Sequence, residues 1–354
     1  MIECRNLAKN YGTLNAVSDI SLYLREQEFI SILGPSGCGK STLLRLIAGL
    51  EVPSAGQLFL QDKEISGKKI SLPPERRNFG MIFQDFALFP HLSVEDNIAF
   101  GVNGSASAKQ QRVKELLKLV SLTHLAKKMP HHISGGEQQR IAVARTLAPR
   151  PRLILMDEPF SNLDYQLRQQ LRRDIRDILK HEGVATILVT HDQVEAITFS
   201  DRVLLMHDGK LVQSGTPEEI YQHPKTLWAS SFVGEANHLS VEWQTTALNS
   251  PFGLLNVPAD IGKETKILMV RPEDFILESG TDGKSNGIVK TVDFSGSVQT
   301  LRVELKNGET IQVSGSPHLL WTPEDSVKIT AERYLCFDSA GNRLNGCSSA
   351  RVSK

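Results

Sequence analysis

Three glycines and one lysine lie close together in the segment ILGPSGCGKSTLLRLIAGL, which begins at Ile32. Gly34, Gly39, Lys40 and Ser41 have the spacing G-x-x-x-x-G-K-S of a phosphate-binding loop. In such a loop, backbone N–H groups surround the phosphates, the lysine reaches the β- and γ-phosphate oxygens, and the hydroxyl holds Mg²⁺. The spacing therefore predicts a nucleotide site. The alternative is a glycine-rich turn between a strand and a helix.

Two acidic residues, Asp157 and Glu158, directly follow the apolar run LILM. A carboxylate at the carboxyl end of a strand, beside a phosphate loop, is well placed to hold Mg²⁺ directly or through water. A second carboxylate one residue further on would polarise a water in line with the terminal phosphate. We expect Asp157 to be the metal ligand and Glu158 the base. The alternative is two solvated acids at the start of a loop.

A second possible anion site lies at Ser134-Gly135-Gly136, immediately before a predicted helix. Two glycines and a hydroxyl at a helix N-terminus expose backbone N–H groups to an anion. One nucleotide does not need two such sites in one chain. We therefore expect this site to serve a nucleotide held by another subunit; the alternative is an ordinary helix cap that contains glycine.

Three other side chains lie where they would assist nucleotide binding or hydrolysis. His191 ends the apolar run ILVT, where it would contact the γ-phosphate and hold Glu158 and the water in position. Gln84 also follows an apolar run, and its amide would reach Mg²⁺ and the water. Tyr11 offers an aromatic face on which a base can stack.

An alternating pattern of elements positions these residues. Up to about residue 235, short apolar runs of strand length alternate with segments whose apolar residues recur at helical spacing, a pattern typical of an α/β sheet. The expected strands include 29–33, 153–157 and 185–190, and the expected helices include 42–50, 108–121 and a helix through Leu167, Leu171, Ile175 and Ile178. Asp208-Gly209 predicts a hairpin turn.

The pattern of apolar and polar residues changes after Phe232. The runs KILMV, GIVKTVDF, VQTLRVEL and ETIQVSG are short alternating strands, and Asn307-Gly308 is a strong hairpin signal. Helix signals nearly vanish. We therefore predict two domains, an α/β domain at 1–235 and a small all-β domain at 236–354.

Composition limits the classes of function. The chain has 354 residues, enough for more than one core, and its 40 basic and 40 acidic residues give no net charge, so nothing indicates a nucleic-acid partner. The four cysteines form no CxxC pair and are typical of reduced thiols. There is no apolar leader and no run of the length of a membrane span. These observations predict a soluble, cytosolic chain that meets a membrane only through a partner.

Seven motifs together resemble those of ATP-binding-cassette (ABC) transporter ATPases, in the same order and spacing over about residues 1–235. They are Tyr11, GPSGCGKST, Gln84, ISGGE, LILMDEP, SNLD and His191. The resemblance implies a P-loop NTPase cassette, an α/β fold with a RecA-like core and a helical subdomain. It also implies that ATP is the nucleotide and that Mg²⁺ is required.

The resemblance assigns a role to each motif. Glu158 corresponds to the general base, His191 to the switch histidine and Gln84 to the Q-loop; Gln84, Ser41 and Asp157 are the implied metal ligands. Asp164 closes the D-loop that begins at Ser161. The implied ATP-binding residues are Tyr11, Val17, Gly34, Pro35, Ser36, Gly37, Cys38, Gly39, Lys40, Ser41 and Thr42.

Residues Ser134, Gly135, Gly136 and Glu137 correspond to the family's signature. In that family two cassettes bind two ATP molecules head to tail, and each ATP is completed by the signature of the other chain. This explains a second anion site and predicts a partner that is a second copy of the chain. The signature usually ends in Gln, where this chain has Glu137; a carboxylate is unfavourable beside phosphate and would instead accept a ribose hydroxyl.

The tail resembles the C-terminal domain of importers that serve iron, polyamines, sulfate, molybdate and maltose, through MVRPEDFIL and NGIVKTVDFSGSVQTLRVEL. That domain is a β-barrel similar to oligonucleotide/oligosaccharide-binding folds and is often regulatory. The segment FQDFALFPHLSVEDNIAFGV is most similar to ferric-iron importers, with polyamine importers next. Sulfate, molybdate or sugar are further alternatives.

The expected protein is therefore the ATPase of a bacterial importer, at the cytoplasmic face of the inner membrane. Its expected partners are integral-membrane permease subunits and, indirectly, a periplasmic substrate-binding protein. The segment 86–101 would dock the permease through exposed Phe86, Leu88, Phe89 and His91.

Two other classes of protein compete with this interpretation. A soluble P-loop GTPase would need an Asn-Lys-x-Asp motif, which is absent from the sequence, and neither a GTPase nor a small-molecule kinase explains 134–137. A non-transport cassette protein usually carries two cassettes or a long coiled-coil insertion, and this sequence has neither pattern.

Overall fold

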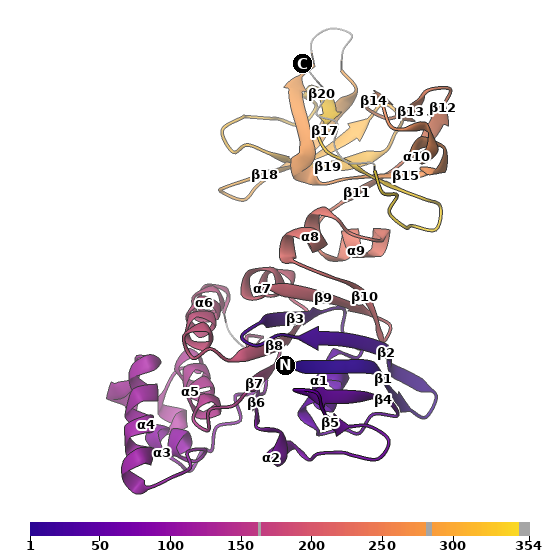
Figure 1. The fold of residues 1–354 in the computed structure, drawn as a ribbon. Helices are drawn as coiled ribbons and strands as arrows, with labels where there is room; N and C mark the ends of the chain where they lie inside the picture. The colour runs from indigo at the N-terminus through magenta and orange to yellow at the C-terminus, as the bar shows by residue number, and fades with distance from the viewer. Residues whose placement is uncertain (162–163, 281–284, 347–354) are drawn as a thin grey trace. The chain divides into compact units, whose positions relative to one another are not determined.

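The computed structural model describes residues 1–161, 164–280 and 285–346. The chain divides into two compact units, Met1–Ile220 and Tyr221–Lys354, which are described separately below. Figure 1 shows the elements of both units. Among the described residues, no helix is long and apolar enough to cross a membrane.

A six-stranded sheet forms the centre of the first unit, in the order β10-β9-β3-β8-β7-β6. Five of its strands are parallel, and the edge strand β10 is joined antiparallel to β9 by the predicted hairpin at Asp208-Gly209. The strands are β3 (Phe29–Leu33), β6 (Phe79–Ile82), β7 (Leu153–Asp157), β8 (Ala185–Thr190), β9 (Arg202–His207) and β10 (Lys210–Gly215). The strands expected from the sequence at 29–33, 153–157 and 185–190 are confirmed.

The central strands are buried on both faces, which is why their sequences are continuously apolar. On β7, Leu153 and Leu155 pack into one hydrophobic core, while Ile154 and Met156 pack into a second core on the opposite face. This alternation follows from the two-residue period of side chains along a strand.

An antiparallel sheet and helix α1 cover the face of Leu153 and Leu155 (Figure 1). The order of this sheet is β2-β1-β4-β5. Its strands are β1 (Ile2–Tyr11), β2 (Leu14–Leu24), β4 (Ala55–Leu60) and β5 (Lys63–Ser66), and α1 spans Lys40–Ala48.

Helices pack against the face of Ile154 and Met156, in the core that also contains residues of α3, α4, α5 and α6. Figure 1 shows α3, α4 and α5 grouped to one side of the parallel sheet. The helices of the unit are α2 (Pro74–Arg77), α3 (Val94–Ala99), α4 (Ala106–Leu119), α5 (Gly135–Leu147), α6 (Tyr165–His181) and α7 (Gln193–Phe199), with short 3-10 turns at Thr123–Leu125 and Pro130–His132. The predicted α/β fold with a helical part is confirmed.

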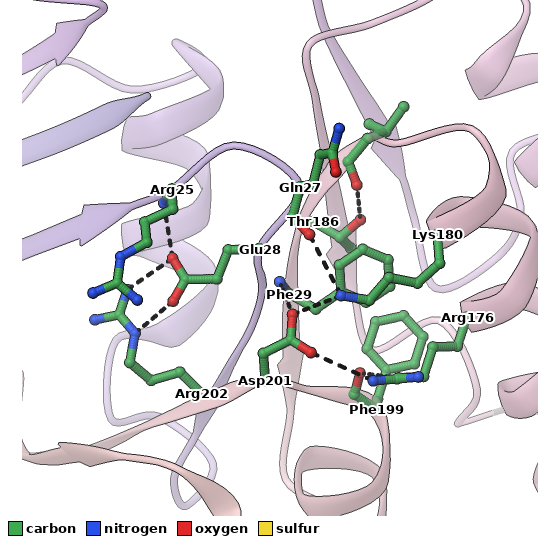
Figure 2. A network of polar contacts seen from close by, with 11 residues as sticks. Arg25, Gln27, Glu28, Phe29, Arg176, Lys180, Thr186, Phe199, Asp201 and Arg202 are labelled. Carbon is green, nitrogen blue, oxygen red and sulfur yellow. Dashed lines mark hydrogen bonds and ion pairs between the residues drawn. The ribbon is translucent and has the colours of Figure 1, made fainter.

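A network of charges fixes the amino end of β3 (Figure 2). The Glu28 carboxylate accepts hydrogen bonds from the backbone N–H of Arg25 and from the Arg202 Nε at 2.9 Å. Asp201 accepts from the backbone N–H of Phe29 and from Lys180 Nζ at 2.7 Å. The network joins β3, β9 and α6 and therefore fixes the position of the covering helix on the parallel sheet.

The second unit is mainly β, as predicted. Its described strands form three sheets, with the orders β11-β15-β21, β12-β13-β14 and β16-β20-β17-β18-β19. The strands are β11 (Asn237–Ser240), β12 (Glu242–Gln244), β13 (Ala247–Ser250), β14 (Gly253–Leu255), β15 (Ile267–Val270), β16 (Phe275–Ser279), β17 (Gly287–Phe294), β18 (Gln299–Leu305), β19 (Thr310–Gly315), β20 (Ser326–Ala331) and β21 (Leu335–Phe337). The Asn307-Gly308 turn joins β18 to β19. The larger apolar core of the unit lies among these strands, and a smaller cluster consists of Met269, Leu335 and Phe337.

The described residues of this part of the chain also form three short helices. They are α8 (Pro217–Gln222), which crosses the division between the units, α9 (Leu227–Phe232) and α10 (Ala259–Glu264), with a 3-10 turn at Pro272–Asp274. The segment 225–235 bonds to residues of the second unit. Arg271 Nη1 donates to the carbonyl oxygens of Ser230 (2.8 Å) and Glu235 (2.8 Å), and the Leu227 N–H donates to Gly341 O. The contacts therefore divide the chain earlier than the predicted change at residue 236.

The cysteines differ from the sequence prediction at one position. Cys4 and Cys38 are free and buried, as expected for reduced thiols. Cys336 is disulfide-bonded, so the prediction is wrong for this residue. Cys347 lies outside the described residues. Spacing could not have revealed the bond, because a disulfide depends on the approach of two Cα atoms in the folded chain.

We expect a chain cut after Gln222, which keeps α8 whole, to fold cooperatively and to bind ATP. A chain cut after Glu235 should bind ATP equally well, but its residues 223–235 should be digested rapidly because Arg271 and Gly341 no longer hold them. Limited proteolysis followed by mass spectrometry checks this, with the full chain as the protected control. Protection of 223–235 in the longer truncated chain would contradict the division between the units.

Candidate nucleotide-binding site

Parallel pairing brings several of the predicted site residues to one edge of the sheet. Leu33 at the end of β3 pairs with Thr190 at the end of β8, and Asp157 at the end of β7 pairs with Val189. The residues that follow these strands are therefore neighbours, although they are far apart in sequence. This is the carboxyl edge of the sheet, where ligands bind in open α/β folds.

The phosphate loop needs glycine at two positions where the chain approaches other backbone. Gly39 has φ +100°, and a Cβ there would lie 1.9 Å from the carbonyl oxygen of Ala16. A Cβ on Gly34 would lie 2.2 Å from the carbonyl oxygen of Met206. Neither contact is possible for a larger residue. The loop is thus fitted between β2 and β9, and α1 begins directly after it at Lys40.

The lysine of the loop is held across the loop itself. The Lys40 side chain is nearly buried, at 5% exposure. Its Nζ donates to the carbonyl oxygens of Gly34 at 2.8 Å and Pro35 at 2.9 Å. The ammonium is therefore aimed over the loop, where phosphate oxygens would meet a positive charge with little competing water.

Ser41 and Asp157 are in direct contact. The Ser41 hydroxyl donates to Asp157 Oδ1 at 2.9 Å. Burial raises the pKa of Asp157; the hydrogen bond from Ser41 opposes this, and the charge of Glu158 adds to it. These two oxygen-bearing side chains form a hard-ligand pair of the kind that Mg²⁺ prefers.

Glu158 and His191 form a second pair at the same edge. The His191 Nδ1 lies 3.1 Å from Glu158 Oε2. The backbone of Glu158 is in the left-handed region, with φ +47°, and its N–H donates to Val189 O at 2.9 Å. The Ser161 hydroxyl donates to the carbonyl oxygen of Glu158 at 2.9 Å. A left-handed conformation in a non-glycine residue is uncommon and often marks a functional site.

A pocket of about 260 Å³ lies over the loop. Its lining residues are Tyr11, Leu14, Ala16, Ser36, Gly37, Gly39, Lys40, Ser41, Thr42 and Glu158. Leu14 and Ala16 were missed by sequence reasoning. Leu14 is 64% exposed. The sequence sign of its place in the pocket was an apolar residue directly after the turn that follows Tyr11.

The implied ATP-binding residues lie at different depths. Gly34 and Pro35 bond to Lys40 through their carbonyl oxygens, as described above. Cys38 is buried, and burial raises the pKa of its thiol. Val17 is fully buried in the apolar core and is not among the residues that line the pocket. Gln84 follows β6, is exposed, and is also not among them.

Tyr11 lines the pocket with 43% of its surface exposed. Lys9 Nζ lies 5.0 Å from the centroid of the Tyr11 ring. The ammonium is fixed there by Glu51 Oε2 at 2.8 Å and by the carbonyl oxygen of Val52 at 2.9 Å. A cation held at this distance polarises the ring and stabilises its position.

The signature residues form the N-terminus of α5. Ser134 is the N-cap, and its Oγ accepts from the Glu137 N–H while Glu137 Oε2 accepts from the Ser134 N–H at 2.7 Å. This is a capping box. The hydrogen bonds that the Ser134 N–H and hydroxyl donate to the Glu137 carboxylate lower its pKa. The carboxylate is thus turned back onto its own helix. Gly136 faces α6, where a Cβ would lie 3.0 Å from Leu171.

The D-loop is described only in part. Asp164 is the N-cap of α6, and its Oδ1 accepts from the Leu167 N–H at 3.0 Å. Asn162 and Leu163, which the SNLD motif includes, lie outside the described residues.

The segment that follows Gln84 is bonded to a buried side chain of α3. Asn97 is fully buried and bonds to the backbone N–H and carbonyl of Phe89. The Phe89 and Phe100 rings lie 4.5 Å apart, and Phe100 is 69% exposed. Phe86, which was predicted to be exposed, is buried, at 8%, because it packs into the helical core. Of the aromatic residues in this part of the chain, Phe83 and Phe100 are exposed, Phe89 is half-buried and Phe86 is buried.

Comparison with known families identifies both units. Residues 17–161 match the ABC transporter family, and residues 268–337 match the TOBE domain.

Curated relatives extend over most of the chain. An Fe(3+) ions import ATP-binding protein, FbpC 2 of Pectobacterium atrosepticum, is 43% identical, covering 87% of this chain and 90% of the relative. The putrescine transport ATP-binding protein PotG of Escherichia coli is 41% identical, covering 88% and 86%. A sulfate/thiosulfate import ATP-binding protein, CysA 2 of Chromobacterium violaceum, is 41% identical, covering 84% and 82%.

Solved structures share the fold of the first unit. The ATP-binding cassette MJ0796, in a dimeric post-hydrolysis state bound to ADP and Pi, is 30% identical with a TM-score of 0.53, covering 61% of this chain and 99% of that one. With motifs, fold and relatives in agreement, the chain belongs to the ABC transporter family and is the ATP-binding, ATP-hydrolysing subunit of an ABC importer.

Proposed function

We propose that the pair Glu158–His191 carries out hydrolysis at the pocket over Lys40. The observation that supports this most directly is the 3.1 Å contact between these two side chains beside the pocket that Glu158 lines. Glu158 would accept the proton of the attacking water, and His191 would hold the carboxylate in place. Lys40 and the loop N–H groups would bind the β- and γ-phosphates and stabilise the charge that develops on them.

Mg²⁺ would be held by Ser41, Asp157 and Gln84. The first two fit this role, because they provide a hydroxyl and a buried carboxylate in contact at 2.9 Å. When bound, the ion neutralises the phosphate charge. The exposed position of Gln84 allows its amide to approach from the loop after β6.

A second copy of the chain would complete each ATP site. Ser134 and the N–H groups of Gly135 and Gly136 stand at the N-terminus of α5 and do not line the pocket of their own chain. Solved cassettes that resemble the first unit are dimeric. Head-to-tail pairing would place this N-terminus against the γ-phosphate of the partner.

Coupling to transport would run through permease subunits at the cytoplasmic face of the inner membrane. The exposed Phe100 and the loop that Asn97 bonds would provide an apolar surface for a permease segment. A periplasmic substrate-binding protein would act through the permease. The second unit would regulate this cycle.

We assign ferric iron as the cargo, because the relative with 43% identity is an Fe(3+) import protein. Putrescine and sulfate are the alternatives, since relatives named for these cargoes are 41% identical.

Asp157→Asn should separate stability from metal binding. The raised pKa of Asp157 means that its stabilising neutral form is fully present below the ordinary carboxyl pKa and is lost as the pH rises through the raised value. Asparagine keeps an acceptor for Ser41 without the charge. Without nucleotide, the variant should therefore resist urea better than the parent chain at neutral pH, and equally well near pH ~3. Mg²⁺-dependent ATP binding should weaken by about 10-fold or more. Lower stability at neutral pH would show that burial does not penalise this carboxylate.

Glu158→Gln should bind ATP but hydrolyse it about 10²–10⁴-fold more slowly. Since nothing then reopens the pair, the variant should become a dimer with ATP and stay a monomer with ADP, as measured by light scattering after size-exclusion chromatography. Lys40→Ala is the control that should lose ATP binding and remain monomeric. Ser134→Arg, added to Glu158→Gln, should abolish the dimer. A monomer in saturating ATP, both alone and with the permease in detergent, would contradict head-to-tail pairing.

Cells whose only copy carries Glu158→Gln should take up radioactive ferric iron about 10-fold more slowly or worse, because hydrolysis limits each transport cycle. Uptake of putrescine and sulfate should not change. The exposed Arg76→Met variant serves as the matched control. Loss of putrescine or sulfate uptake with normal iron uptake would assign the other cargo.

A further inference from the structure

A basic pocket lies in the groove between α6 and α7, apart from the residues assigned to ATP. Its volume is about 300 Å³, and it is lined by Gln169, Arg172, Arg173, Arg176, Val194 and Thr198. The four residues from α6 have the spacing i, i+3, i+4 and i+7, so they form one face of that helix. No acidic residue is among those that line the pocket.

Arg172 is the residue that indicates a ligand. It is 94% buried, with 6% of its surface exposed, and its Nε has no hydrogen-bond partner. Within the described parts of the chain, its guanidinium takes part in no ion pair within 4 Å. A buried N–H donor without an acceptor is unfavourable, and buried charges in proteins are normally paired. An anion in the groove would therefore supply acceptors that the Arg172 guanidinium does not find within the described parts of the chain.

The acidic groups around Arg172 are already engaged. Asp192 accepts from the Glu195 N–H at 3.0 Å and lies 3.7 Å from Arg168. Glu195 accepts a hydrogen bond from the Thr190 hydroxyl at 2.6 Å. They act on Arg172 only through their field.

The two other arginines of the pocket differ in how many of their donors are already bonded. Arg176 Nε donates to the carbonyl oxygen of Phe199 at 2.9 Å, and its Nη2 lies 3.4 Å from Asp201 Oδ1 (Figure 2). Arg173 is exposed, and it has no ion pair among the described residues. Arg172 and Arg173 thus have donors to offer, while Arg176 contributes a fixed positive charge.

We propose that this pocket binds a tetrahedral oxyanion, either inorganic phosphate or sulfate or the phosphate group of a small ester. Two free guanidiniums and a third fixed charge match a dianion with several acceptor oxygens, and planar guanidinium forks suit phosphate and sulfate geometry. A carboxylate, with one charge and two oxygens, would leave part of this charge unmatched. The pocket volume holds one such group together with a few waters.

Isothermal titration of the full chain with sodium sulfate, sodium phosphate and glycerol 3-phosphate tests this proposal. Saturating adenylyl imidodiphosphate and Mg²⁺ keep the nucleotide pocket filled, and sodium chloride at equal ionic strength corrects for screening. The parent chain should bind one oxyanion. Arg172→Met should weaken that binding by about 10-fold or more, because the buried donor is lost. Arg76→Met, which removes an exposed arginine elsewhere, should leave it unchanged.

Arg173→Gln decides the result if Arg172→Met does not fold, since the exposed Arg173 can be replaced without disturbing the core. This variant should bind sulfate at least a few-fold more weakly and lose the rise in melting temperature that sulfate gives the parent chain. Binding of glycerol 3-phosphate as tightly as phosphate assigns the pocket to phosphate esters, and binding of the inorganic ions alone assigns it to those. Absence of saturable binding, or equal binding by the parent chain and both variants, would overturn the proposal.

Discussion

The parallel hydrogen-bond ladder through β3, β8 and β7 is the constraint on which the rest of the first unit depends. It sets Leu33 beside Thr190 and Val189 beside Asp157, so three chain segments leave the sheet at one edge. The phosphate loop, Asp157, Glu158 and His191 all lie at or directly after these strand ends, and Gln84 follows the neighbouring strand β6. A slip of one residue would turn the side chains of a strand to the opposite face and would separate Asp157 from Ser41.

Desolvation then gives this edge its chemistry. The same burial that makes β3, β7 and β8 continuously apolar also surrounds Lys40 and raises the pKa of Asp157. Charges in such a place interact strongly with a ligand, because little water competes with them. Their neighbours limit the cost of burial, since Lys40 has two carbonyl acceptors and Asp157 has the Ser41 hydroxyl. These hydrogen bonds hold Lys40, Ser41 and Asp157 in place. Phosphate oxygens or a metal ion would bind the same side chains, either beside these bonds or in place of them.

Spacing in the sequence was enough to predict the groups at this edge. The loop with Lys40, the strand ending at Asp157 and the strand before His191 are each local patterns, and the parallel sheet follows from their alternation. The side chain of Val17 could not be placed, because an apolar residue on β2 can face either the nucleotide or the core, and here it is buried. The prediction that Phe86 is exposed was wrong for a similar reason, since an aromatic side chain in a loop beside a helical core can turn into that core.

Long-range approaches account for the other differences. Leu14 and Ala16 reach the pocket because β2 passes over the loop, which no local pattern shows. The division between the units depends on bonds to a segment that lies more than thirty residues earlier in the chain. Arg271 donates to the Ser230 carbonyl oxygen, and the Gly341 carbonyl oxygen accepts from the Leu227 N–H. The change of sequence pattern at residue 236 indicated where the short strands begin. It could not indicate which of the two units the residues before it contact.

The position of Glu137 resolves the electrostatic difficulty that the sequence raised. A carboxylate in a signature that faces phosphate would repel it if the side chain pointed outward. In the capping box, both the backbone N–H and the hydroxyl of Ser134 donate to Glu137 Oε2, which lowers the pKa and fixes the charge against its own helix. The N–H groups of Gly135 and Gly136 are left at the helix end, where a phosphate would be bound by backbone rather than by side chain. A glutamate at this position therefore holds the N-cap more strongly than an amide oxygen would, because its acceptor is charged, and it leaves only backbone donors to meet a phosphate at this helix end.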